Sequence, residues 1–101
     1  MDVFEILVTR GAEGDLRGLR PRDRAIVVDA IEVQLSSEPE SPARNRKVLV
    51  ALRPPWSGLD PVRELRVGDF RVFHGVDDKE GRVYVRAVRR KPPHRTTEEI
   101  L

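Results

Sequence analysis

The sequence predicts an α+β domain in which two helices pack on one face of a small, mainly antiparallel sheet. Residues 65–76 contain two short alternating runs joined by Gly68-Asp69, the local pattern of a tight β-hairpin. Residues 21–36 instead repeat apolar side chains at four-residue spacing, which is typical of an amphipathic helix. At 101 residues, the chain is expected to form one domain over residues 1–101.

The first elements are short. Residues 3–9 are rich in β-branched and aromatic side chains and predict an N-terminal strand. Residues 9–15 have the composition of a turn with capping side chains. Leu16 and Leu19 then indicate one short helix that ends near residues 18–20.

A second helix is predicted over residues 21–36. Pro21 suits its first turn, because the N–H that proline lacks would have no hydrogen-bond partner within the helix there. The apolar face of this helix contains Val27, Ile31 and Leu35. Residues 36–46 follow with two prolines and a polar composition, which predicts a loop that ends the helix.

The middle of the chain has no clear period. Residues 47–52 form a short apolar run, but two prolines follow at once, so residues 44–61 are predicted to be mostly irregular. The side chains expected to pack on the core from this segment are Val48, Leu49, Leu52 and Trp56. Trp56 also has an alternative role, as a platform on which a nucleic-acid base stacks.

Three strands are predicted to close the fold as a meander, over residues 62–67, 70–76 and 82–89. In the last strand Val83, Val85 and Ala87 alternate with polar residues, so they are expected to share one apolar face. The opposite face of the sheet is then expected to carry the arginines. After two further prolines, the Thr-Thr-Glu-Glu tail either begins a short helix or is disordered.

The charges are segregated along the chain. Residues 1–43 hold five arginines against nine acids, whereas residues 44–95 hold fourteen basic residues against six acids. This asymmetry indicates a polyanionic or acidic partner. The alternative is a solvated surface with many ion pairs that stabilises the domain.

Composition also excludes several kinds of site. The chain has no cysteine, which excludes disulfides, thiolate zinc sites and cysteine nucleophiles. Its two histidines do not suffice for a multi-histidine metal centre. The apolar runs fall short of the ~20 residues that cross a bilayer. We therefore expect a soluble, cytoplasmic protein.

This order of elements, with the Leu-Arg-Val-Gly-Asp-Phe-Arg-Val-Phe hairpin and a basic C-terminal segment, resembles toxins of the RelE/ParE superfamily of bacterial type II toxin–antitoxin modules. The resemblance implies a cognate antitoxin as partner. For the RelE branch it also implies an endoribonuclease that cleaves messenger RNA on the ribosome without metal or cofactor. For the ParE branch it implies a protein that inhibits DNA gyrase and has no nuclease activity.

The resemblance also implies site residues. Arg71 matches the family's arginine after the hairpin aromatic, and Lys91 matches a basic residue after the last strand. The candidate catalytic residues are Arg71, Lys91, His94 and Arg66. The candidate RNA-binding residues are Arg63, Arg86, Arg89, Arg90 and Arg95.

These residue types suit RNA cleavage by a ribose 2′-hydroxyl. Arginine binds phosphate oxygens through a planar fork and keeps its charge. A histidine can transfer the protons, and positive neighbours favour the neutral form of His94; the alternative is a solvent-exposed loop histidine. At the position of Glu64 a lysine would favour RNA binding, whereas the carboxylate of Glu64 would repel RNA if it faced the site. His74 is expected to be structural, and the only tyrosine, Tyr84, lies within a strand.

Overall fold

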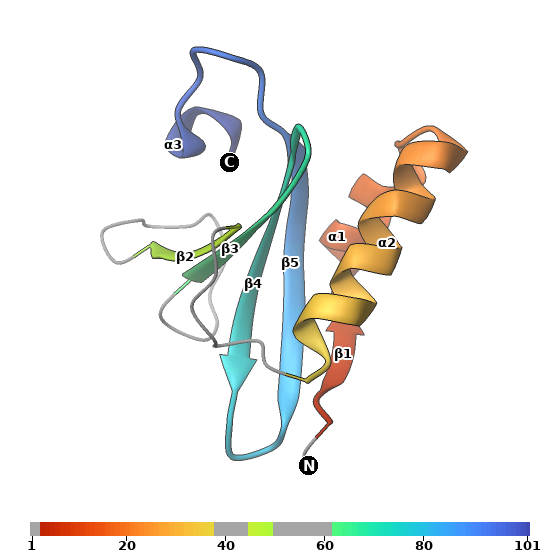
Figure 1. The fold of residues 1–101 in the computed structure, drawn as a ribbon, viewed down its shortest axis with the longest axis vertical. Coiled ribbons are helices and arrows are strands. Elements are labelled where there is room, and N and C mark those ends of the chain that lie inside the picture. Colours follow the sequence, from red (N-terminus) through yellow and green to blue (C-terminus); the bar gives the residue numbers. More distant parts are fainter. Residues whose placement is uncertain (1–2, 38–44, 50–61) are drawn as a thin grey trace.

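The chain folds into a five-stranded sheet with two helices against one of its faces (Figure 1). The computed structural model describes residues 3–37, 45–49 and 62–101. Its elements are β1 (Glu5–Val8), α1 (Arg10–Arg17), α2 (Pro21–Leu35), β2 (Arg46–Leu49), β3 (Val62–Val67), β4 (Phe70–Asp77), β5 (Arg82–Arg90) and α3 (Thr97–Ile100). The strand order is β1-β5-β4-β3-β2, in which only the β1–β5 pair is parallel. The predicted α+β class is confirmed.

Helix α1 begins earlier than the pattern predicts, because residues 9–15 form most of it instead of a turn. Thr9 explains the difference. Its side-chain oxygen accepts a hydrogen bond from Ala12 N at 3.4 Å and so caps the helix. The same hydroxyl donates to the carbonyl of Val85 at 2.9 Å, which ties the start of α1 to β5.

Helix α2 follows the prediction closely, with Pro21 in its first turn. Its buried residues are the predicted Val27, Ile31 and Leu35. Arg24 fastens the two helices together: its Nε donates to the carbonyl of Leu16 at 2.9 Å, and one terminal nitrogen donates to that of Leu19 at 3.0 Å. The side chain therefore binds backbone carbonyls at the end of α1 and in the connection that follows it.

The meander also follows the prediction. Strand β3 has the predicted bounds, while β4 and β5 each extend one residue further. Gly68 has φ 57 at the first central position of the β3–β4 turn, and Asp69 does not share this left-handed conformation. A two-residue turn with glycine in that place is a type II′ turn, whose twist matches that of the flanking strands.

A β-bulge interrupts the pairing of β4 with β5. Phe73 lies opposite Ala87, but the next residue, His74, lies opposite Val85. Arg86 is therefore an extra residue on β5 with no partner across the ladder.

The bulge corrects one prediction about β5. Val83 and Val85 pack toward the helices as expected, but Ala87 lies in a separate cluster on the opposite face. Val88 takes the helix-facing position instead. Because side chains alternate again after the bulge, Arg89 lies on the face opposite the helices.

The sheet therefore has an apolar cluster on each face. The larger cluster joins α1 and α2 to the sheet and includes Leu16, Val27, Ile31, Leu35, Leu65, Phe70, Val72, Val83, Val85 and Val88. We call the other side, turned away from α1 and α2, the open face. Its cluster contains Val62, Phe73 and Ala87, with Leu49, Ile100 and Leu101 packed against it.

Residues 46–49 form strand β2, whereas the sequence pattern predicts an irregular segment there. The strand forms because it pairs with the outer edge of β3, which needs hydrogen-bond partners. Leu49 packs on the open-face cluster as predicted, but Val48 is 40% exposed, so its predicted burial is wrong. Leu52 and Trp56 lie outside the described residues.

The C-terminal tail forms helix α3 over the open face (Figure 1). A capping box starts it: Glu99 N donates to the Thr96 hydroxyl at 3.3 Å, and Thr96 N donates to the Glu99 carboxylate at 3.0 Å. Of the two predicted outcomes for this tail, the short helix is confirmed. None of the helices in the described ranges is long and apolar enough to cross a membrane.

Candidate functional site

Three arginines lie in one line across the open face. Arg66 on β3 is the register partner of Arg71 on β4, and Arg71 is that of Arg89 on β5. Leu65 and Val67 pack toward the helices, so Arg66 between them faces the other way. Because neighbouring strands are about 5 Å apart, the line spans about 10 Å. We call Arg66, Arg71 and Arg89 the arginine row.

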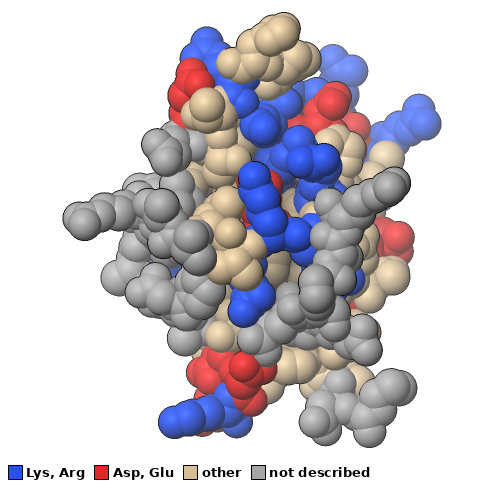
Figure 2. Space-filling view, turned by 60° about the vertical axis from the view of Figure 1, so that its left-hand side comes forward, with Lys and Arg blue, Asp and Glu red and all other residues tan. Residues whose placement is uncertain are grey.

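The surface around the row is basic. Figure 2 turns the left-hand side of Figure 1 forward and shows Lys and Arg side chains gathered in a column down the middle of this side. Such a surface attracts polyanions over several ångströms of solution. The sequence prediction that the sheet carries arginines on the face opposite the helices is confirmed for the members of the row.

Each arginine of the row has a different environment. Arg71 is only 9% exposed, and its Nη1 donates to the carbonyls of Gly68 and Phe70, at 2.9 Å each. Arg89 forms an ion pair with Asp15 of α1 and also donates to the carbonyl of Val88 at 3.2 Å. Arg66 is exposed. The exposed end of the row is therefore on β3.

Glu64 faces the same side as the row, but it is 2% exposed. The hydroxyl of Thr97 donates to its carboxylate at 3.0 Å, and Lys47 Nζ lies 3.8 Å from the other carboxylate oxygen. From its place in the sequence, Glu64 is expected to repel RNA if it faces the site. In this structure its charge is covered by α3 and balanced by Lys47.

A small open pocket lies beside the exposed end of the row. Asn45 is fixed there, because its side-chain amide donates to Gln34 of α2 at 2.6 Å and its carbonyl accepts from Arg66 N at 2.6 Å. The residues that line the pocket are Asn45, Arg46, Lys47, Glu64 and Arg66. The pocket therefore combines ammonium and guanidinium groups with the carboxylate of Glu64 beside the row.

Lys91 and His94 lie in the segment that joins β5 to α3. Lys91 is half-buried, and its backbone N–H donates to the carbonyl of Asp69 at 2.7 Å, so it lies at the hairpin end of the sheet. His94 is exposed and has φ 69, in a turn that Arg95 N closes onto the carbonyl of Pro92 at 3.3 Å. This left-handed conformation is costly for a residue with a Cβ atom.

Two predicted RNA-binding residues lie on the helix side of the sheet. Arg90 Nη2 is 3.6 Å from the carboxylate of Asp23 on α2, and its guanidinium lies 4.7 Å from the ring centre of Phe70. Arg63 is the register partner of His74 and alternates with Glu64, so it shares the helix-side face. The structure does not bring these two side chains to the arginine row.

The remaining predicted RNA-binding residues make local contacts. Arg86, the extra residue of the bulge, lies over the ring of Tyr84 with 5.4 Å between guanidinium and ring centre. Arg95 forms an ion pair with Glu99 of α3 at 3.1 Å. Both are at the borders of the open face, one toward the middle of β5 and the other in the tail.

His74 is 1% exposed and belongs to the packed interior, as predicted. The pKa of its imidazole is lowered to about 4, mainly by burial; the hydrogen bond to the carbonyl of Val72 raises this pKa, and the nearby charges of Arg63 and Arg46 lower it. The ring is therefore neutral near pH 7. Over residues 3–37, 45–49 and 62–101, no three His, Cys, Asp or Glu side chains gather as metal ligands would.

Sequence reasoning missed two residues that shape this face, Asp15 and Thr97. Each contacts its partner across a large sequence separation, 74 residues for Asp15 and Arg89 and 33 for Thr97 and Glu64. No local pattern indicates either pair.

Comparisons with known proteins agree with the fold. The family model of the ParE toxin of the type II toxin–antitoxin system parDE matches residues 6–91. The toxin–antitoxin complex RelBE2 from Mycobacterium tuberculosis contains a chain that is 30% identical, with a TM-score of 0.70, covering 90% of this chain and 94% of that one. The archaeal RelE–RelB complex from Pyrococcus horikoshii has a chain that is 18% identical, with a TM-score of 0.70, covering 93% and 99%. No curated protein sequence matches significantly.

Proposed function

Because the chain belongs to the RelE/ParE family of type II toxin–antitoxin toxins, we propose that it is an endoribonuclease that cleaves messenger RNA on the ribosome without a metal ion. The observation that carries this proposal is the arginine row. Three guanidinium groups aligned across adjacent strands suit the phosphates of one RNA strand, because each guanidinium can bind two phosphate oxygens.

The reaction is an attack of a ribose 2′-hydroxyl on the adjacent phosphate. It needs a proton acceptor, a proton donor for the leaving oxygen, and cations for the charge that develops on the phosphate. Arg66 and Arg71 supply the cations in this proposal. Lys91 and His94, which lie beyond the end of β5, bring the groups that transfer protons. Arg71 is 9% exposed, so RNA contact with it requires that the groups around it move.

A second candidate function is inhibition of DNA gyrase without nuclease activity. It is supported by the family model that matches the chain, which is that of ParE. In this case the open face is a docking surface for a protein or for DNA, and Arg71 mainly stabilises the β3–β4 turn through its bonds to Gly68 and Phe70.

A cognate antitoxin is the proposed partner under either function. Of the similar structures named above, one is the toxin–antitoxin complex RelBE2 and the other is a RelE–RelB complex. We expect an acidic segment of that partner to cover the arginine row or to displace α3. Because charge mainly accelerates encounter, added salt is expected to slow association more than it speeds dissociation.

Induction of the chain alone in a bacterial host tests the proposed function. Messenger RNA 5′ ends are mapped against the reading frame, and DNA is examined for double-strand breaks. Cuts that cluster within translated codons support the nuclease. Growth arrest with intact messenger RNA and broken DNA contradicts it and supports gyrase inhibition.

A further inference from the structure

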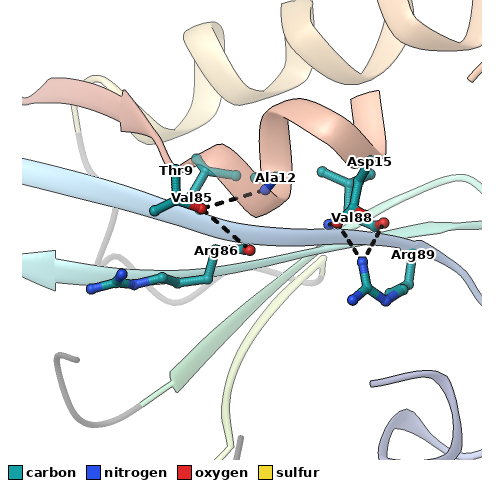
Figure 3. Close-up of polar contacts among 7 residues, drawn as sticks. All are labelled: Thr9, Ala12, Asp15, Val85, Arg86, Val88 and Arg89. Carbon is teal, nitrogen blue, oxygen red and sulfur yellow. Dashed lines mark hydrogen bonds and ion pairs between the residues drawn. The ribbon is translucent and has the colours of Figure 1, made fainter. Parts of the chain in front are cut away.

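Helix α1 lies along an edge of β5 that strand β1 does not reach (Figure 3). Strand β1 pairs with β5 only as far as Val8 and Val85. Beyond that point side chains of the helix segment bind the edge: the Thr9 hydroxyl donates to the carbonyl of Val85 at 2.9 Å, and Asp15 accepts from Val88 N at 3.0 Å. Asp15 thus replaces a strand partner for β5.

The same carboxylate oxygen of Asp15 also accepts from Nη1 of Arg89 (Figure 3). Both side chains are partly buried, so water screens the pair less than it screens an exposed one. The backbone N–H of Val88 holds the carboxylate in place while the carboxylate holds the guanidinium. Arg89 is therefore fixed at the outer edge of β5.

Fixing Arg89 in this way relieves a conflict within the arginine row. Like charges directly opposite each other on neighbouring strands are destabilising, and Arg71 faces both Arg66 and Arg89. Asp15 draws the guanidinium of Arg89 toward the edge of the sheet. Among the ion pairs between described residues, the one with Asp15 is the only pair that involves a member of the row.

We propose that Asp15 is a positioning residue of the RNA-binding face, which keeps the three guanidinium groups of the row spread across β3, β4 and β5. The spread row binds successive phosphates of one strand, whereas a released Arg89 joins Arg71 on a single phosphate and shifts the strand. This inference rests on the proposed function. Asp15 itself does not touch RNA; it acts through Arg89.

The variant D15N removes the ion pair with Arg89 but keeps the contact with the edge of β5. Its side-chain amide oxygen still accepts from Val88 N, whereas the side chain no longer carries the charge that holds Arg89. RNA binding is expected to tighten several-fold. The salt dependence of binding is expected to steepen by about 0.7 in log–log slope, the value for one more phosphate charge neutralised on a single strand, because the row gains one net positive charge when Asp15 loses its negative charge. Cleavage is expected to fall by about tenfold to a hundredfold, because the scissile phosphate is misplaced.

The variant D23N is the matched control. Asp23 pairs with Arg90 at 3.6 Å, but on the helix side of the sheet, so D23N changes the net charge equally without touching the row. The salt-dependence slope of its RNA binding and its cleavage rate are expected to equal those of the unaltered chain. Because D15N is at risk of misfolding, R89Q probes the pair from the other side and leaves the bond between Asp15 and Val88 in place. It is expected to lower the slope by about 0.7.

The test measures fluorescence anisotropy of a labelled single-stranded oligoribonucleotide with the full chain over a range of salt concentrations. It is combined with mapped messenger RNA 5′ ends. A steeper slope for D15N, absent in D23N and abolished in the D15N/R89Q double variant, supports the inference. Equal salt-dependence slopes for D15N and D23N, or an unchanged slope in R89Q, overturn the positioning role of Asp15. Cleavage by the unaltered chain would still sustain the proposed function in that case. Absence of both RNA binding and cleavage in the unaltered chain overturns both.

Discussion

The hydroxyl of Thr97 donates a hydrogen bond of 3.0 Å to the carboxylate of Glu64 and thereby ties the C-terminal helix to the middle of the sheet. Ile100 and Leu101 pack on the open-face cluster next to it. Helix α3 has four residues, too few to be stable by itself, so these contacts determine whether it stays on the sheet. The open face is consequently partly covered by α3.

Loss of the Thr97 hydroxyl is expected to loosen α3. The variant T97V keeps the shape of the side chain but leaves a buried carboxylate oxygen without its donor, at a cost of roughly 1–3 kcal/mol in the free energy of unfolding. Hydrogen exchange of the amides in α3 is expected to accelerate. T97S, which keeps the hydroxyl, is the control and is expected to exchange like the unaltered chain. Equal exchange in T97V and T97S would show that the bond does not hold the helix.

The free energy of unfolding is expected to decrease as the pH is lowered from 6.5 to 4, because of His74. Burial lowers the pKa of this residue from 6.5 to about 4, so in this interval the unfolded chain binds a proton that the folded chain does not. At one pKa unit per 1.4 kcal/mol, the loss amounts to roughly 3 kcal/mol at the acid end.

Urea unfolding at a series of pH values measures this effect. H74Q, which does not titrate, is expected to lose less stability than the unaltered chain over the same interval, although it is less stable at pH 7. Carboxylates titrate in both proteins and cancel in the comparison. Parallel pH curves for the two proteins contradict the assignment of the effect to His74.

One substitution, glycine to alanine, is expected to act in opposite directions at two positions. Gly68 has φ 57 and no atom within 4 Å of an added Cβ, so G68A introduces backbone strain alone and destabilises by about 1 kcal/mol. Gly14 lies in helix α1, also with nothing within 4 Å, so G14A stabilises by about 0.5–1 kcal/mol. Thermal unfolding of both variants provides the measurement. A stabilising G68A contradicts the type II′ turn.

Much of the fold could be predicted from sequence because local signals agreed with the tertiary structure. Pro21, the four-residue apolar spacing of α2 and the Gly68-Asp69 turn each specify one local conformation. The local sequence patterns failed where contacts between residues far apart in the chain determine the structure. Strand β2 forms because β3 offers an edge, and α1 starts at Arg10 because Thr9 both caps it and binds β5.

The candidate site was predictable in composition but not in arrangement. Strict alternation along β5 places Ala87 on the same face as Val83 and Val85. The bulge at Arg86 instead moves Ala87 and the residues after it to the face opposite to the one that alternation predicts. This reversal brings Arg89 to the arginine row and turns Arg90 toward Asp23. A single extra residue in a ladder depends on packing across the whole sheet, so no local pattern reports it.

Substitution of Arg66 tests whether the arginine row is the RNA-cleaving surface. This residue is exposed, so R66A is expected to leave the fold intact while it removes one guanidinium from the row. K79A is the matched control, because Lys79 is also an exposed cation and lies in the β4–β5 turn. Each chain is induced alone, and messenger RNA 5′ ends are mapped within translated codons. Cuts by the unaltered chain and by K79A are expected, with at least a tenfold reduction for R66A; undiminished cutting by R66A would show that the arginine row is not the RNA-cleaving surface.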